Sequence, residues 1–345
     1  MAEAPPAVAQ RPAVAERVEA PRLPAPRGPL SGAVLAALSG PPAPLSLPRP
    51  EVADPLADDD LQLALYVGYE LHYRSFAGVD ERWEWDPRLL AFVAELEAVY
   101  EAALRQSVVI GAVAPDAVEA ELRRMVADDD GPPLSRTLER TASLEQFREF
   151  MVHRSAYQLK EADPHSWAVP RLAGRAKEAL VEVQADEYGG GRPGRMHASL
   201  FAASMRAVGL DDTYGAYLDA IPGTTLATVN LMSLLGLHRR LRGGIVGHLA
   251  VFEMTSPEPN RRYGNGLRRL GFGPEATEFF DEHVEADAVH EAVAAHDLAQ
   301  GLAVAEPDLV GDILFGAAAL LHLEARFAGH LLGRWAAGQS SLHPC

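Results

Sequence analysis

Residues 281–290 read Asp281-Glu282-His283-Val284-Glu285-Ala286-Asp287-Ala288-Val289-His290, a pattern that predicts a helix with one chemically distinctive face. At about 100° per residue, His283, Asp287 and His290 lie within about 60° of one another on that helix. Two imidazoles and a carboxylate on one face are typical of a metal site, and nitrogen and oxygen donors suit iron, manganese or zinc. A solvated acidic helix with two surface histidines is the alternative, because short His/Asp patterns also arise by chance.

An acid within an apolar run is the next candidate ligand. Glu253 lies in Leu249-Ala250-Val251-Phe252-Glu253-Met254, near the end of a long apolar helix. A buried carboxylate is costly unless it is paired or binds a cation. An ion pair with one of the arginines at 239–242 is the alternative to a metal.

A glycine-rich segment separates two further candidates, Glu187 and His197. The segment reads Tyr188-Gly189-Gly190-Gly191-Arg192-Pro193-Gly194-Arg195. Four glycines and a proline do not belong in a helix interior, so we expect a break that turns Glu187 and His197 toward the same interior. A plain linker with an exposed acid and a capping histidine is the alternative. No predicted strand precedes the segment, which excludes a phosphate-binding loop.

Composition excludes several classes of protein. The 345 residues are 48% hydrophobic and 23% charged, which is enough for a sizeable core. There are 48 acidic and 31 basic residues, a net charge of −17, so we expect no nucleic acid and no membrane among the partners. The single cysteine, Cys345, excludes a disulfide framework and a thiolate metal cluster.

No segment predicts a membrane span or a secretory signal. The best apolar run, residues 313–332, is interrupted by four polar or charged side chains. Charges and prolines occupy the N-terminal region where a signal sequence would be uninterrupted. We therefore expect a soluble, cytoplasmic protein.

Helical spacing of apolar residues continues over most of the chain. We predict helices over residues 61–71, 89–104, 115–128, 143–160, 172–188, 195–208, 213–220, 224–252, 262–270, 275–297 and 306–337. Strand-like alternation is nearly absent and no repeat of fixed period occurs. The predicted fold class is an all-α helical bundle.

Prolines and acidic runs suggest the domain limits. Residues 1–50 hold 12 of the 26 prolines, so we expect residues 1–54 to be a mostly disordered tail with at most a transient helix over 30–38. Asp60 is predicted to cap the helix that begins at Leu61. An acidic run followed by Gly131-Pro132-Pro133 marks a boundary between residues 55–130 and 131–340.

Taken together, these residues resemble the haem-oxygenase-like diiron oxidases and oxygenases, often called iron-containing redox enzymes. The family signature has a Glu and a His on one core helix, a Glu on a second, and H-x3-D-x2-H on a third. In this chain it is matched in order by Glu187 with His197, Glu253, and His283-Asp287-His290. The resemblance covers roughly residues 60 to 335.

The spacing within this signature is similar to that of the N-oxygenase branch of the family. Glu187 and His197 are ten residues apart, which is wider than in the simpler members. That branch adds a carboxylate from a preceding helix, and Glu161 occupies the matching place. The chain ends about 55 residues after His290, so we do not expect the C-terminal cupin domain of the branch's type enzyme.

The resemblance implies a haem-oxygenase-like bundle in residues 131–340, with an N-terminal helical extension in residues 55–130 that forms a homodimer. It implies two Fe ions (Fe2+/Fe3+) held by seven ligands: Glu161, Glu187, His197, Glu253, His283, Asp287 and His290. Four carboxylates balance two divalent ions, which suits a buried site. We expect Glu187 and Glu253 to bridge the ions.

Three functions remain open at this point. The first is a dioxygen-dependent oxygenase that N-oxygenates an amine-bearing small molecule, with dioxygen as co-substrate and an external electron donor. The second is oxidative C–C cleavage of a fatty or amino acid on the same core. The third is a non-catalytic iron-binding helical module. Haem binding is not expected, because the candidate histidines are grouped with acids.

Overall fold

The computed structural model describes residues 20–44 and 48–344, except for the side chains of residues 285–289. Over these residues the chain forms fifteen α-helices and no strand, so the predicted all-α class is confirmed. The helices are α1 (Pro29–Leu38), α2 (Asp59–Glu70), α3 (Pro87–Ser107), α4 (Val118–Ala127), α5 (Leu134–Arg140), α6 (Leu144–Gln158), α7 (Asp163–Ser166), α8 (Gly174–Glu187), α9 (His197–Ala207), α10 (Gly223–Leu237), α11 (Arg242–Thr255), α12 (Pro257–Arg269), α13 (Pro274–Ala292), α14 (Gly301–Ala305) and α15 (Val310–Ala336).

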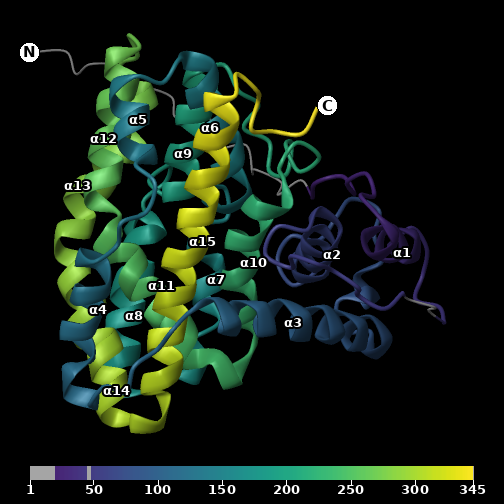
Figure 1. Cartoon of the computed structure of the whole chain (residues 1–345), viewed down its shortest axis with the longest axis horizontal. Helices are drawn as coiled ribbons and strands as arrows, with labels where there is room; N and C mark the ends of the chain where they lie inside the picture. The colour runs from purple at the N-terminus through teal and green to yellow at the C-terminus, as the bar shows by residue number, and fades with distance from the viewer. Residues whose placement is uncertain (1–19, 45–47, 345) are drawn as a thin grey trace, which may run out of the picture.

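The long helices form an upright bundle, and α1 to α3 lie along one side of it (Figure 1). Within the bundle α11 packs along α15, and α13 packs against α9 and α12. Glycines allow the backbones of α11 and α15 to touch: a Cβ atom at Gly247 would overlap the carbonyl of Ile313, and one at Gly316 would overlap the carbonyl of Gly244. This close contact fixes the helix that carries Glu253.

Most predicted helices are present. The structure adds α5 and α7, which were not predicted, and α12 begins at Pro257 instead of residue 262. Two predicted segments differ further. Residues 213–220 form turns instead of a helix, and Gly215 within them has a φ of +75°. The helix predicted over 224–252 is divided into α10 and α11. At the break His238 has extended backbone angles, and the guanidinium of Arg171 donates hydrogen bonds to the carbonyls of Gly236 and Leu237 at the end of α10.

A π-helix extends the helix that carries the H-x3-D-x2-H motif. It runs from Val293 to Gln300, directly after α13, and packs against α8 and α11. The predicted helix over 275–297 is therefore present, but its last turns are wider than in an α-helix. Such π segments occur frequently near functional sites.

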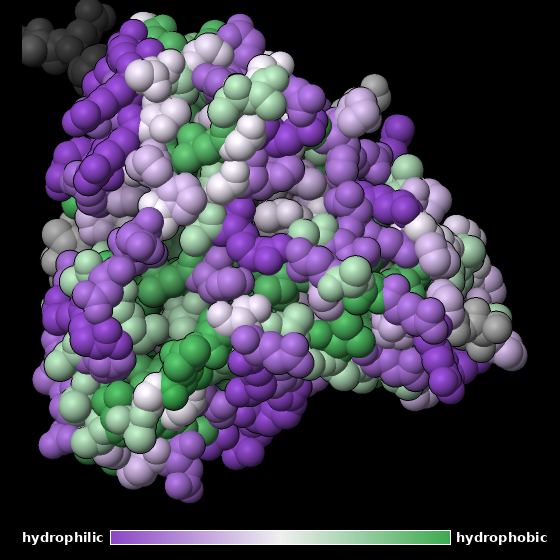
Figure 2. All heavy atoms as spheres, viewed as in Figure 1, coloured by the Kyte–Doolittle hydropathy of each residue, from purple (hydrophilic) through white to green (hydrophobic). Residues whose placement is uncertain are grey.

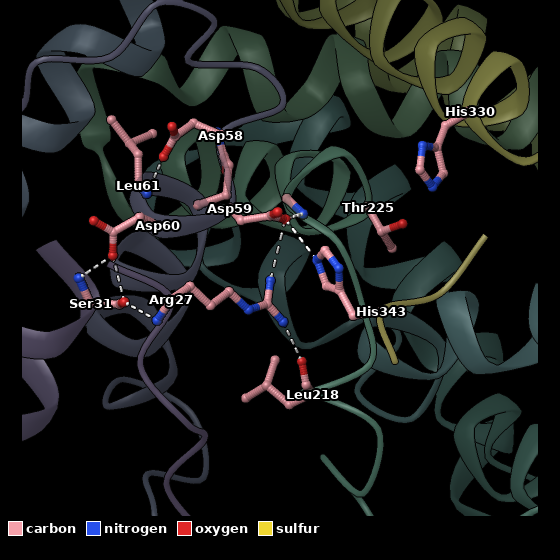
Figure 3. A network of polar contacts seen from close by, with 12 residues as sticks. Arg27, Ser31, Asp58, Asp59, Asp60, Leu61, Leu218, Thr225, His330 and His343 are labelled. Carbon is pink, nitrogen blue, oxygen red and sulfur yellow. Dashed lines mark hydrogen bonds and ion pairs between the residues drawn. The ribbon is translucent and has the colours of Figure 1, made fainter. Parts of the chain in front are cut away.

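The N-terminal segment differs from the expected disordered tail wherever the structure describes it. Helix α1 packs against α2 and buries Leu30, Val34 and Leu38 in the main core. Asp60 accepts hydrogen bonds from the backbone amides of Leu30 and Ser31 at 2.8 and 2.7 Å, so it caps α1. Figure 3 shows the contact between Asp60 and Ser31. The prediction that Asp60 caps the helix beginning at Leu61 is therefore wrong. The side chain of Asp58 caps this helix, α2, by accepting a hydrogen bond from the backbone amide of Leu61.

A second network joins the N-terminal segment to the C-terminal residues (Figure 3). Asp59 lies 3.0 Å from Nε2 of His343 and 3.7 Å from the guanidinium of Arg27. Arg27 also donates a 2.7 Å hydrogen bond to the carbonyl of Leu218. The two ends of the described chain thus pack on the same side of the bundle, and the domain limits at residues 54 and 130 stay predictions.

None of the helices in the described ranges is long and apolar enough to cross a membrane.

Candidate metal centre

Glu187 and His197 face each other across the glycine-rich break. Helix α8 ends at Glu187 and α9 begins at His197. Between them Gly189 and Gly190 have φ values of +67° and +58°, which favour glycine because it lacks a Cβ atom. The carboxylate Oε2 of Glu187 lies 2.9 Å from Nδ1 of His197. The expected break that turns both side chains inward is confirmed.

Glu161 and His283 complete a buried cluster with these two residues. One ligand atom from each of Glu161, Glu187, His197 and His283 lies within 4.8 Å of the others. Nε2 of His283 is 3.6 Å from Oε1 of Glu161, and the His197 and His283 rings have centroids 4.3 Å apart. The four residues are between 2% and 8% exposed. Residues separated by more than 120 positions therefore converge in one dry interior.

Glu253 and His290 form the adjoining part of the site. Nδ1 of His290 lies 3.8 Å from Oε2 of Glu253, and both residues are buried. Glu253 does not pair with the arginines at 239–242, whose described partners are backbone carbonyls and the carboxylates of Glu101 and Glu306. The alternative of an arginine ion pair is therefore wrong for Glu253.

The side chain of Asp287 lies outside the described residues, although its backbone is within α13. The structure thus brings together six of the seven predicted ligands. That these residues bind metal stays a prediction.

Hydrogen bonds to the outer ring nitrogens assign the histidine tautomers. Nδ1 of His283 lies 2.8 Å from the carbonyl of Phe279, so it donates a proton and Nε2 faces Glu161. Nε2 of His290 lies 2.8 Å from Oδ2 of Asp186, so it donates and Nδ1 faces Glu253. Histidines that bind metals are commonly oriented in this way by a carbonyl or a carboxylate. Sequence reasoning missed Asp186, although it directly precedes Glu187 in the chain.

Two neighbours along the chain contact Glu161. The hydroxyl of Tyr157 donates to Oε1 of Glu161 at 3.3 Å. The amide nitrogen of Gln158, in the orientation that satisfies its hydrogen bonds, lies 2.7 Å from the same oxygen. The following residue, Ala162, has a φ of +75°, which strains a residue with a Cβ atom. Glu161 is therefore held in a tight turn between α6 and α7.

A buried ion pair anchors this turn to the N-terminal helices. Nζ of Lys160 lies 2.9 Å from Oε2 of Glu70 on α2, and the two side chains are 1% and 0% exposed. The hydroxyl of Tyr214 donates to both carboxylate oxygens of Glu70 at 2.8 Å. The Lys160 ammonium also lies 4.9 and 4.4 Å from the ring centroids of Tyr66 and Tyr73. Lys160 directly precedes the predicted ligand Glu161 and is 90 residues from Glu70. No sequence pattern indicated this pair.

Burial and neighbouring charges shift the pKa values of Glu161 and Glu187 in opposite directions. Burial, together with the charge of Glu187, raises the pKa of Glu161. Burial also acts against ionisation of Glu187, but His197, His283 and His290 outweigh it and lower the pKa of Glu187. The pKa of His197 is raised because attraction to Glu187 exceeds the effect of burial.

The donor set fits an iron site. It contains only carboxylate oxygens and imidazole nitrogens, which suit divalent iron. Oε2 of Glu187 and Nδ1 of His197 are buried and make no hydrogen bond of normal geometry with any described residue. Such atoms are costly to bury unless a cation binds them. A metal ion bound between the two carboxylates and two imidazoles of this cluster would provide both atoms with a partner.

The remaining buried histidines have partners that explain them without a metal. His153 contacts the hydroxyls of Thr225 and Ser341 at 2.7 and 3.0 Å. Nδ1 of His248 lies 3.2 Å from Nε2 of His165. These contacts indicate a structural role for His153 and His248.

Comparisons with known proteins place the fold and the family. The family described as iron-containing redox enzymes matches residues 148–325, which is more than half of the chain. Nitrosourea synthase of Streptomyces achromogenes subsp. streptozoticus is 28% identical over 170 residues, which are 49% of this chain and 36% of that protein. The match thus spans only about a third of the length of that relative.

Two solved structures have a similar arrangement of helices. A domain of unknown function with a haem oxygenase-like fold from Shewanella denitrificans OS217 aligns with a TM-score of 0.52 and 14% identity, over 68% of this chain and all of that one. A CADD-like protein of unknown function from Nostoc punctiforme PCC 73102 aligns with a TM-score of 0.51 and 17% identity, over 64% and 97% of the two chains. The predicted haem-oxygenase-like bundle is confirmed. The chain belongs to the family of iron-containing redox enzymes.

Proposed function

We propose that this protein is a non-haem diiron oxygenase that uses dioxygen to N-oxygenate an amine-bearing small molecule. The observation that carries the proposal is the buried cluster of Glu161, Glu187, His197 and His283, with Glu253 and His290 beside it. The partial similarity to nitrosourea synthase supports nitrogen as the atom that is oxidised.

The proposed reaction balances with an external reductant. One oxygen atom of dioxygen enters an N–H bond of the amine and yields a hydroxylamine. The other oxygen atom is reduced to water by two electrons and two protons, which an external electron donor supplies. Bound iron would supply the redox chemistry that activates dioxygen, which no side chain of the chain can perform alone.

The residues of the chain have three roles in this proposal. His197, His283 and His290 would hold the metals through the ring nitrogens that face the cluster, and the carbonyl of Phe279 and the carboxylate of Asp186 keep two of these rings in orientation. Glu161, Glu187, Glu253 and Asp287 would balance two divalent ions. The low exposure of the cluster excludes bulk water.

Metal stoichiometry tests the proposal first. Anaerobic Fe(II) loading of the metal-stripped protein should give two iron ions per chain by elemental analysis. The His283→Ala variant should lose most of this iron because Nε2 of His283 lies in the cluster. The matched control is His238→Ala, since His238 pairs with Glu97 outside the cluster at 2.8 Å. Equal iron content in both variants would contradict the site.

Product analysis then separates the remaining functions. Iron-loaded protein, a chemical reductant and a panel of amines should consume dioxygen and yield hydroxylamines by mass spectrometry. An alkene or a shortened acid as product would instead indicate C–C cleavage. Iron binding without dioxygen consumption would indicate a non-catalytic module. We further propose a homodimer, for which α3 offers the exposed residues of the N-terminal helices because residues 61–70 of α2 are buried within the chain. Sedimentation analysis of the whole protein tests this.

A further inference from the structure

Two cavities of very different size share part of their wall within the bundle. The larger has a volume of about 640 Å³, and the smaller has a volume of about 20 Å³ and lies among α6, α10, α11 and α15. Four residues line both cavities: Arg154, Phe252, Leu320 and Glu324. Exposed residues such as Asp130 also line the larger cavity, so it opens to solvent. On the face shown in Figure 2, hydrophobic residues lie in the depression between α15 and the connection from α4 to α5.

The smaller cavity adjoins the proposed metal centre. Tyr157 lines it, and the hydroxyl of Tyr157 donates a 3.3 Å hydrogen bond to Oε1 of Glu161. Phe252 also lines it and directly precedes Glu253 on α11. The rings of Tyr157 and Phe252 pack edge to face with centroids 5.4 Å apart. Two predicted ligands are thus direct neighbours of residues in this wall.

The volume of the smaller cavity admits only a very small molecule. Pockets for organic ligands measure roughly 300–1,000 Å³, so an amine substrate does not fit a cavity of about 20 Å³. A single water needs roughly 10–15 Å³. The cavity therefore has space for one water or for one diatomic gas molecule.

Half of the residues in this wall are apolar. They are Leu231, Met232, Phe252, Leu320 and Leu323. All of them except Phe252 are at most 4% exposed. The apolar side chains offer dispersion contacts to a small molecule but no hydrogen bonds.

The polar half of the wall has its hydrogen bonds elsewhere. It consists of Arg154, Tyr157, Thr228, His248 and Glu324. Arg154 and Glu324 bond to each other at 2.8 and 2.6 Å, and the hydroxyl of Thr228 donates to the carbonyl of Thr225 at 2.8 Å. These five side chains are all described, and none has a fully buried nitrogen or oxygen without a hydrogen-bond partner. A buried water typically bonds to polar groups that would otherwise be unsatisfied, so water gains little from this cavity.

Dioxygen fits both the size and the chemistry of the smaller cavity. It is a diatomic, apolar molecule that transfers favourably from water to apolar surroundings and does not depend on hydrogen bonds. We propose that the smaller cavity is a dioxygen site, which the gas enters from the larger cavity and leaves past Tyr157 toward the cluster. The delivery of dioxygen to a metal rests on the proposed function, whereas occupancy of the cavity by dioxygen requires no metal.

Relaxation of methyl groups by dissolved dioxygen, which is paramagnetic, tests the occupancy. The probe is dioxygen under pressure, applied to the metal-stripped full chain with isotope-labelled methionine methyl groups. Met232 lines the smaller cavity and is 3% exposed, and the matched control Met205 is 0% exposed and lines neither cavity. The enhancement of relaxation should be roughly threefold or more larger at Met232 than at Met205. Equal enhancement at the two methyl groups would overturn the assignment.

Variants test the location of the gas. Thr228 lines the cavity from α10, so Thr228→Leu should occupy part of the space and lower the enhancement at Met232 to the level at Met205. Leu323→Phe should do the same if Thr228→Leu does not fold. Thr224→Leu is the matched control, because Thr224 lies one turn earlier on α10, is also half-buried and lines neither cavity. This control should leave the enhancement at Met232 unchanged. Unchanged enhancement in both cavity variants would overturn the location.

The outcomes for the dioxygen site and for the proposed function are distinguishable. If both are correct, Thr228→Leu should raise the KM for dioxygen roughly threefold or more at unchanged iron content. If the protein binds no iron but Met232 shows the expected enhancement, the proposed oxygenase is wrong and the dioxygen site stands. If iron loads and amines are oxygenated while the two methionines are enhanced equally, the oxygenase stands and the dioxygen site is wrong.

Discussion

Single residues outside the set of predicted ligands orient the proposed metal centre. His290 lies between Glu253 and Asp186, at 3.8 and 2.8 Å from its two ring nitrogens. Asp186 is largely exposed, with 57% of its side chain accessible, but it determines which nitrogen of His290 faces the site. A surface carboxylate thus sets the tautomer of a buried imidazole.

Replacement of this carboxylate should weaken metal binding without unfolding the protein. In Asp186→Asn the hydrogen bond to Nε2 of His290 becomes weaker, and we expect the affinity for Fe(II) or Co(II) to fall by about 10- to 100-fold. Competition with a chelating dye measures this change. Glu182→Gln on the exposed side of the same helix is the control and should leave the affinity unchanged. Equal affinities of the two variants would contradict the role of Asp186.

The buried pair of Lys160 and Glu70 yields a prediction for stability. Lys160→Met leaves the Glu70 carboxylate buried without its counter-charge, and the free energy of unfolding should fall by about 3–5 kcal/mol. The double variant with Glu70→Gln should recover part of this loss, because no buried charge remains. Urea unfolding followed by circular dichroism measures both. A double variant that is less stable than Lys160→Met would contradict this account.

At the scale of helices, breaks and close contacts decide where ligands lie. The glycine-rich break ends α8 at Glu187 and begins α9 at His197, so the two side chains meet at 2.9 Å instead of lying on one helix. At the break between α10 and α11, Arg171 donates hydrogen bonds to the last carbonyls of α10 and so stabilises the end of that helix. The first break was predictable from glycines and the second was not, because Arg171 is 65 residues from its partner.

The contact between α11 and α15 should tolerate no added methyl group. In Gly247→Ala the new Cβ atom overlaps the backbone of Ile313, so the helices must separate, and we expect a loss of about 1–3 kcal/mol or more. Because α11 carries Glu253, iron content should fall as well. Gly311→Ala is the control, because Gly311 is an exposed position in the first turn of α15 and its Cβ atom would meet nothing within 4 Å. This variant should be more stable by up to about 1 kcal/mol. Thermal unfolding compares the two; equal stability would contradict the packing argument.

At the scale of the whole molecule, the N-terminal helices pack against the bundle and support the proposed metal centre. Helices α1 to α3 lie outside residues 148–325, which match the family, but α2 packs against α10 and α3 packs against α15. Glu70 at the end of α2 binds the residue before Glu161. The part of the chain that is absent from the family match therefore contacts the segment that carries one predicted ligand.

Buried neutral histidines should make the whole fold sensitive to acid. Burial lowers the pKa of His165 to about 4 and lowers that of His248 well below its usual value. The unfolded chain binds these protons near pH 6.5 and the folded chain does not, so the free energy of unfolding falls as the pH falls from about 6.5 toward about 4. For His165 alone the loss is about 3 kcal/mol.

Urea unfolding of the metal-stripped protein at a series of pH values measures this loss. His165→Gln should show a smaller decrease over the same range, because its side chain does not titrate. An unchanged slope in this variant would contradict the assignment of the acid sensitivity to His165.

Local pattern in the sequence was sufficient for the helical class and for most of the proposed ligands. Apolar spacing predicts helices because the period of 3.6 residues is a local property of the backbone. His283 and His290 share a face for the same reason, and the glycines around 189–194 indicate a break because of their own conformational preference. The resemblance to the family added Glu161, whose place no local pattern marks.

Only the tertiary structure decided which residues from distant segments meet. The Lys160–Glu70 pair, the contact of Asp186 with His290 and the division of α10 from α11 all depend on partners 65 to 104 residues apart. A cavity of about 640 Å³ likewise takes its lining from six separate segments, residues 126–136, 150–158, 201, 252–263, 279–280 and 320–328. Burial of charge, close contact of backbones and the shape of a cavity are properties of the packed chain, and sequence separation carries no direct information about them.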